Sequence, residues 1–194
     1  MPSRRFAVCG LASAVAIFFV ASSIVLIGSP LRPGLVAVAG MPAAAFTLPD
    51  ADLHMLSLNT LRGKVVLLCI ADPRYCGSEQ YSRLAALQRS YRSEPRVAPV
   101  TVIRTEIEPG TVRARELCQN LATAGIGGAR VIDVQADVWR DYRVDQSATL
   151  FVIDAEGTIR LRTNFAGDRT AELARARTVI DNLLPDSVAV ARGR

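Results

Sequence analysis

The hydrophobic positions of this chain form one long apolar block near the N-terminus, followed by shorter runs separated by polar residues. The block covers residues 6–28, contains no charged residue and follows Arg4 and Arg5. As a helix it is long enough to cross the roughly 30 Å of hydrocarbon in a bilayer. Because positive charge stays on the cytoplasmic side, residues 1–5 are predicted to be cytoplasmic. The rest of the chain is predicted to lie outside the cytoplasm, after a single pass through the cell membrane.

A cleaved signal peptide is the alternative interpretation of the same block. Ala37-Val38-Ala39 offers an A-x-A cleavage site, and cleavage would release a secreted or periplasmic protein. The apolar core of a signal peptide usually spans about 7 to 15 residues, so the greater length of this block favours an uncleaved anchor. Residues 29–45 contain spaced Pro and Gly without a charge pattern and are predicted to be a linker.

From residue 46 onward, apolar runs typical of strands alternate with segments of helical spacing. The run 65–71 is continuous and rich in β-branched residues, which predicts a central strand covered on both faces. Leu84, Leu87 and Tyr91 then recur at helical spacing. The other predicted elements are a small hairpin over 46–58, strands at 97–103 and 129–134, helices at 111–124, 138–142 and 170–184, and a hairpin at 150–161 around the D-x-x-G turn 154–157.

This order of elements predicts a single α/β domain over residues 46–185. The alternating strands and helices and the late hairpin predict a mixed central sheet with helices on both faces, and the early hairpin is an N-terminal extension. Residues 186–194 are predicted to be a flexible tail.

The net charge of +5 does not change this picture. Its basic residues are scattered, Lys64 is the one lysine, and no basic run interleaves with aromatic residues as in proteins that bind single strands. We therefore expect no nucleic-acid partner.

Two motifs in the predicted domain resemble the redoxin branch of the thioredoxin superfamily. They are LRGKVVL at 61–67 and FVIDAEG at 151–157, on either side of an α/β stretch. The branch includes thiol-disulfide oxidoreductases of the TlpA type, peroxiredoxins of the AhpC/TSA type and copper chaperones of the SCO/SenC type. The resemblance implies a thioredoxin-like fold with a key cysteine just after the first central strand, a place that Cys76 occupies.

The chemistry expected at Cys76 is that of a thiolate near a helix N-terminus. Unpaired backbone N–H groups and the helix dipole favour an anion there, and Arg74 is a possible additional stabiliser. A thiolate attacks disulfides and peroxides. Cys118, on the second predicted helix, is a possible resolving thiol; its alternative is a small core residue.

The residues around Cys76 depart from all three patterns. Glu79 stands where a C-x-x-C motif has its second cysteine, although it also gives a weak peroxiredoxin-like match in Cys-Gly-Ser-Glu. The cis-proline of the family falls at Ala148, and the remaining copper ligands fall at Gln80 and Gln146. One thiolate is a poor copper site, so neither a metal nor another cofactor is predicted.

Three hypotheses follow. The first is a membrane-anchored redoxin whose Cys76 undergoes reversible oxidation or disulfide exchange with an extracytoplasmic protein thiol or disulfide partner. The second is a non-catalytic binding or assembly module that keeps the thioredoxin frame. The third is a relative of the copper-handling proteins that has lost ligands.

Overall fold

The computed structural model describes residues 38–75, 77–145, 148–164 and 169–184. The predicted anchor 6–28, residues 1–5, most of the predicted linker and the predicted tail 186–194 lie outside these residues. Within the described part of the chain, no helix combines the length and hydrophobicity that a membrane span requires.

A five-stranded mixed sheet forms the centre of the domain, in the order β5-β4-β3-β6-β7. The middle strand β3 pairs in parallel with β4 and antiparallel with β6, so the predicted mixed sheet is confirmed. The bounds are Val65–Ala71 for β3, Val97–Arg104 for β4, Ala129–Asp133 for β5, Thr149–Ile153 for β6 and Ile159–Thr163 for β7.

Strand β3 is buried along its whole length because successive side chains enter two different cores. Leu67 and Cys69 belong to one hydrophobic cluster, whereas Leu68 and Ile70 belong to the other. A continuous apolar run is what a strand covered on both faces requires.

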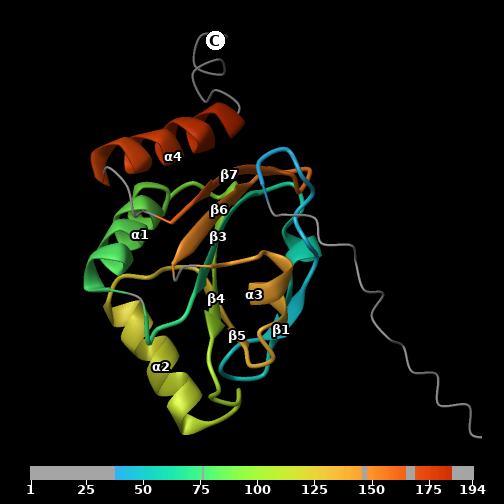
Figure 1. The fold of residues 1–194 in the computed structure, drawn as a ribbon, viewed down its shortest axis with the longest axis vertical. Coiled ribbons are helices and arrows are strands. Elements are labelled where there is room, and N and C mark those ends of the chain that lie inside the picture. Colours follow the sequence, from blue (N-terminus) through green and yellow to red (C-terminus); the bar gives the residue numbers. More distant parts are fainter. Residues whose placement is uncertain (1–37, 76, 146–147, 165–168, 185–194) are drawn as a thin grey trace, which may run out of the picture. The chain divides into compact units, whose positions relative to one another are not determined.

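Helices cover both faces of the sheet, as predicted (Figure 1). One core receives side chains from α1, α2 and α4, including Leu84, Leu121 and Ile180. The opposite core receives Val138 of α3 and residues of the N-terminal hairpin and the 3₁₀ helix η1. The bounds are β1 Thr47–Pro49, β2 Met55–Ser57, η1 Leu58–Leu61, α1 Ser78–Ser90, α2 Val112–Thr123, α3 Asp137–Asp141 and α4 Arg169–Leu183.

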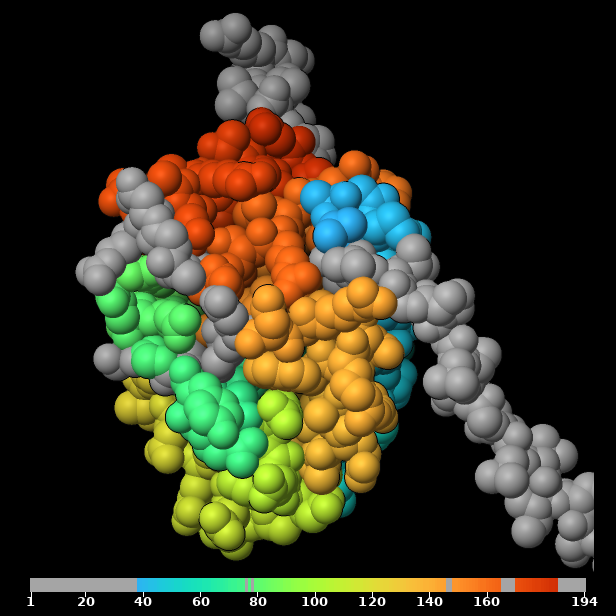
Figure 2. Space-filling model, viewed as in Figure 1, coloured from blue at the N-terminus to red at the C-terminus, as the bar shows by residue number. Residues whose placement is uncertain are grey.

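The end of the predicted linker is part of the folded domain. Backbone hydrogen bonds join Gly40 N–H to the Ile159 carbonyl at 2.7 Å and Ala43 N–H to the Gly157 carbonyl at 2.9 Å. The buried Tyr142 hydroxyl donates to the Ala44 carbonyl at 2.8 Å. Figure 2 shows this blue segment lying against the orange atoms of the β6–β7 region. Residues 40–44 therefore cover part of the β7 edge.

The D-x-x-G turn between β6 and β7 forms as the sequence predicts. Gly157 has a φ of +83°, a left-handed conformation that favours glycine. The buried Asp154 carboxylate accepts hydrogen bonds from Thr158 N–H at 2.7 Å and Arg160 Nε at 2.6 Å. These contacts hold the hairpin that completes the sheet.

Candidate functional site

A buried carboxylate organises the loop that follows β3. Asp72 is completely buried, and its side chain accepts three hydrogen bonds from Arg74: from the backbone N–H at 3.0 Å, from Nε at 3.1 Å and from Nη2 at 2.9 Å. The guanidinium of Arg104, at the end of β4, lies 3.8 Å from the same carboxylate. The loop is thus tied to the carboxyl ends of two neighbouring parallel strands.

Asp72 is ionised because its arginine partners outweigh the effect of burial. Burial acts to raise the pKa of the carboxyl group, but the hydrogen bonds from Arg74 and the positive charges of Arg74 and Arg104 hold it below its usual value. Sequence pattern alone does not single out this residue as part of a site. The available signal was an acidic residue directly after a buried strand with an arginine two positions later.

Arg74, predicted as a thiolate stabiliser, interacts with two carboxylates. Besides Asp72, its Nη1 lies 3.3 Å from Glu106, and its guanidinium lies 5.5 Å from the centre of the Tyr75 ring. The guanidinium is half-exposed. Arg74 precedes Cys76 by two positions in the sequence, and Cys76 lies outside the described residues. The stabilising role of Arg74 stays a prediction.

The first turn of α1 follows directly after this position. Gly77 is the N-terminal cap, and its N–H donates to the side-chain oxygen of Gln80 at 3.2 Å. Glu79, at the place of a second cysteine, is ion-paired with Arg83 at 2.9 Å. The position at which a C-x-x-C motif has its resolving thiol is therefore occupied by a carboxylate in an ion pair.

Ala148, at the place of the family's cis-proline, has an unusual backbone conformation. It is buried and has a φ of +58°, in the left-handed region that non-glycine residues rarely adopt. The next residue, Thr149, is in register with Ile70, so Ala148 lies beside the end of β3. Strained backbone of this kind clusters at functional sites.

A cleft of about 650 Å³ opens at the carboxyl ends of β3 and β4. In open α/β sheets, ligands bind in the crevice outside the carboxyl ends of the strands. Its lining residues come from the loop after β3, the segment after β4 and the start of α2: Asp72, Pro73, Arg74, Thr105, Glu106, Ile107, Glu108, Thr111, Arg113 and Leu117.

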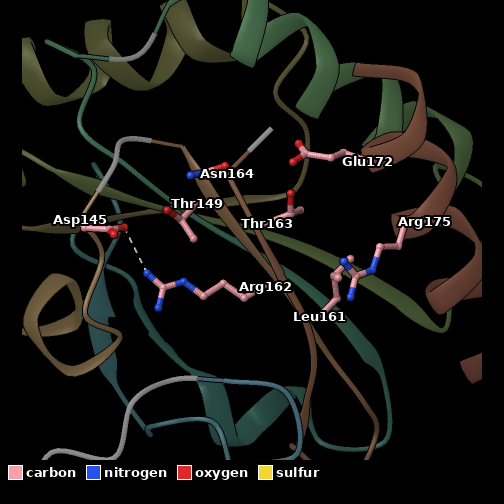
Figure 3. A pocket seen from close by; sticks show the side chains of 8 residues that line it. All are labelled: Asp145, Thr149, Leu161, Arg162, Thr163, Asn164, Glu172 and Arg175. Carbon is pink, nitrogen blue, oxygen red and sulfur yellow. Dashed lines mark hydrogen bonds and ion pairs between the residues drawn. The ribbon is translucent and has the colours of Figure 1, made fainter. Parts of the chain in front are cut away.

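A second, more polar hollow of about 340 Å³ lies between the β6–β7 hairpin and α4. Figure 3 shows Asp145 and Arg162 facing each other on one side, joined at 3.2 Å, with Glu172 and Arg175 of α4 on the other. Thr149, next to Ala148, also lines it. The start of β6 therefore has a hollow beside it as well.

The structure places Cys118 beside the N-terminal hairpin. Its thiol is buried and lines a cavity of about 360 Å³ together with Asp50 and His54 of the hairpin and Arg130 of β5. Burial raises the pKa of the Cys118 thiol. Cys118 thus lies beside β5, whereas Cys76 follows β3 in the chain, and β4 separates these two strands. The resolving role of Cys118 stays a prediction. Cys69 lies in β3 and is buried in the hydrophobic core.

The described residues contain no group of three or more His, Cys, Asp or Glu side chains arranged to hold a metal ion.

Comparison with known proteins finds similarity in structure alone. Neither a protein-family model nor a curated protein matches the chain. A protein assigned as thiol:disulfide interchange protein DsbE from Chlorobium tepidum superposes with a TM-score of 0.61 at 22% identity, over 76% of this chain and 98% of its own. A protein assigned as a disulfide isomerase from Bacteroides thetaiotaomicron gives a TM-score of 0.60 at 20% identity, over 76% and 92%.

A third similar structure is a secreted disulfide oxidoreductase of Mycobacterium tuberculosis, described as homologous to Escherichia coli DsbE. Its TM-score is 0.53 at 17% identity, and the match covers 69% of this chain and 95% of that one. At these identities the similarity establishes the fold. The described domain therefore has the thioredoxin-like fold, as it occurs in structures assigned as thiol:disulfide oxidoreductases.

Proposed function

We propose that this chain is a membrane-anchored, extracytoplasmic thiol-disulfide redoxin whose reactive group is the Cys76 thiol. The observation that carries the proposal is the place of Cys76 in the chain. It directly precedes Gly77, the N-terminal cap of α1, and directly follows the loop that Asp72 ties to β3 and β4. A thiol at a helix N-terminus is stabilised as the thiolate by the helix dipole and unpaired N–H groups.

The reaction proposed for Cys76 is disulfide exchange with a protein partner. The thiolate attacks one sulfur of the partner's disulfide, a new sulfur–sulfur bond forms, and the partner's other sulfur leaves as a thiolate that takes up a proton. A second thiol, either Cys118 or an external one, then attacks the Cys76 sulfur of the mixed disulfide. The partner is released with both sulfurs reduced, and Cys76 is left oxidised as a disulfide.

The cleft beside the loop is where we place the partner's chain. Its walls carry Arg74 and Arg113 as well as Glu106 and Glu108, so it offers polar contacts of both signs to a polypeptide. The apolar side chains Ile107 and Leu117 line the same cleft.

The location proposed for the protein rests on the apolar block. Residues 6–28 would anchor the chain with its N-terminus in the cytoplasm, after Arg4 and Arg5. Carbonate extraction of membranes tests the anchor, and N-terminal sequencing of the mature protein tests cleavage after Ala39. Release by carbonate together with a new N-terminus near residue 40 would replace the anchor with a signal peptide.

The deciding experiment is alkylation of the full-length chain as a function of pH, with peptide mass spectrometry to follow each cysteine separately. We expect Cys76 to titrate at or below pH 7, well under the usual thiol pKa of about 8.5. Arg74→Gln tests the contribution of the guanidinium, and Arg115→Gln, on the surface of α2, is the matched control. A Cys76 that titrates at 8.5 or above would contradict a redox role.

The second candidate function is a non-catalytic binding or assembly module. Two observations favour it: the ion pair of Glu79 with Arg83 at the place of a second cysteine, and Ala148 at the place of the cis-proline. The two functions differ in cells. If the Cys76→Ser variant complements a deletion strain as fully as the wild-type chain does, the binding or assembly module is favoured. The copper-handling alternative has no supporting ligand cluster among the described residues.

A further inference from the structure

A cavity of about 560 Å³ lies at the opposite end of the sheet from the proposed redox site. It is formed by the end of α1, the start of β4 and the loop between α2 and β5. Val97 and Pro99, at the first positions of β4, line it, whereas Arg104, at the last position, contacts Asp72. At about 3.3 Å per residue, the eight residues of β4 separate the two sites by roughly 20 Å.

Three arginines line this cavity: Arg89 from the last turn of α1, Arg92 from the turn that follows α1, and Arg130 from β5. No acidic residue lines it, and among the described residues no carboxylate forms an ion pair with any of the three. Tyr91, which lines the cavity, donates a hydrogen bond from its hydroxyl to the carboxylate of Asp181 at 2.8 Å, but Asp181 itself does not line the cavity. The cavity therefore concentrates positive charge.

Two buried N–H groups of the lining residues have no acceptor among the described residues. Gln88 is 3% exposed; its side-chain oxygen accepts from Gly127 N–H at 2.8 Å, and its Nε2 has no partner. The Nε of Arg130 is likewise buried without a partner, while its Nη1 donates to the Ile126 carbonyl at 3.0 Å. A buried donor without an acceptor is costly, and it is normally satisfied by water, an ion or a ligand.

The rest of the lining is largely apolar. Val97, Pro99 and Ile126 form this part, so a bound molecule would meet both hydrocarbon and guanidinium groups. The volume falls within the range of pockets for small molecules. We propose that this cavity binds a small organic anion, with an apolar body against β4 and a carboxylate, sulfonate or phosphate group held by the arginines.

The site differs from a glycine-rich phosphate loop, although the turn 125–128 contains three glycines. The backbone N–H of Gly127 is already bonded to Gln88, so this loop supports a side chain of the wall. Gly128 has a φ of +73° and lies directly against the Pro99 carbonyl, which holds the loop on β4. Side-chain guanidinium groups would therefore bind the anion, for which their planar fork is suited.

The test uses the full-length chain in a mild detergent and two fluorescent probes. The anionic probe is 8-anilinonaphthalene-1-sulfonate, and the neutral probe is N-phenyl-1-naphthylamine, the same aromatic body without the sulfonate. The double variant Arg89→Gln/Arg92→Gln removes two charges from the cavity. The control Arg115→Gln/Arg140→Gln removes two charges from α2 and α3, at residues that do not line it.

We expect the double variant to bind the anionic probe about tenfold more weakly or worse, because each lost hydrogen bond to a charged group has at least that effect. The control variant should bind it like the wild type, and the neutral probe should not distinguish the variants. Thermal unfolding by circular dichroism checks that both variants fold. The proposal would be overturned if the wild type and the folded double variant bound the anionic probe with equal affinity. It would also be overturned if the double variant lost affinity for the neutral probe as much as for the anionic one.

Discussion

The buried carboxylate of Asp72 should make a measurable contribution to the stability of the domain. Asp72→Ala removes the acceptor of three hydrogen bonds from Arg74. A hydrogen bond to an ionised acceptor contributes about 1.5–3 kcal/mol. The two guanidinium bonds count for less than the backbone bond, because the Arg74 side chain is 51% exposed and solvent screens its charge. We therefore expect Asp72→Ala to lower the free energy of unfolding by about 2–3 kcal/mol at pH 7.

Two matched variants separate the contributions to this loss. Asp72→Asn keeps one oxygen for the Arg74 backbone N–H but loses the charge, so it should cost less than Asp72→Ala. Glu106→Gln alters an exposed partner of Arg74 and should change stability by less than about 0.5 kcal/mol. Urea unfolding followed by circular dichroism gives these free energies.

The pH dependence of the loss follows from the lowered pKa of Asp72. A carboxyl group whose pKa is lowered by folding adds stability above its ordinary pKa of 3.8, and this stability is lost as the pH falls through the lowered value. The difference between wild type and Asp72→Asn should therefore be constant above about pH 5 and shrink in strong acid. A cost of less than about 0.5 kcal/mol for Asp72→Ala, or a difference between wild type and Asp72→Asn that grows in acid, would contradict a stabilising role of the ionised carboxylate.

Two further predictions concern the glycine turn and the second buried thiol. Gly128→Ala should lower the free energy of unfolding by more than about 3 kcal/mol, because a Cβ there would clash with the Pro99 carbonyl. The control Gly63→Ala, also at positive φ but in open space, should lower it by about 1–2 kcal/mol. Urea unfolding measures both values, and equal losses would contradict the clash. Cys118, whose pKa is raised by burial, should be alkylated at pH 8 far more slowly in the folded chain than in urea, and mass spectrometry that found equal rates would show that the thiol is accessible.

Much of the secondary structure could be predicted from local pattern. The run 65–71 is β3 with the predicted bounds, and the strands at 97–103 and 129–134 and the helices at 111–124 and 170–184 match the structure to within a residue or two. The glycine of the D-x-x-G turn is at the positive φ that the hairpin requires. These features depend on hydrophobic period and turn chemistry, which neighbouring residues carry.

The candidate site was predictable only in part. The place of Cys76 in the chain, after a central strand and before a helix, came from the order of elements and the family resemblance. The surroundings did not: the ion pairs of Arg74 and the burial of Asp72 depend on contacts between residues up to 32 positions apart. Cys118 falls within the predicted helix 111–124, but the pattern of that helix does not indicate that the thiol lies beside the N-terminal hairpin.

The sequence alone therefore determined the elements, their order and the place of the candidate thiol along the chain. The tertiary structure decided which residues meet. It paired residues 40–44, which lack any periodic pattern, with the edge of β7, and it gathered three arginines from α1, the turn after it and β5 around one cavity. The physical reason is that local conformation follows from the spacing of neighbouring side chains, whereas strand pairing, burial of charge and cavities depend on how distant segments fill the same space.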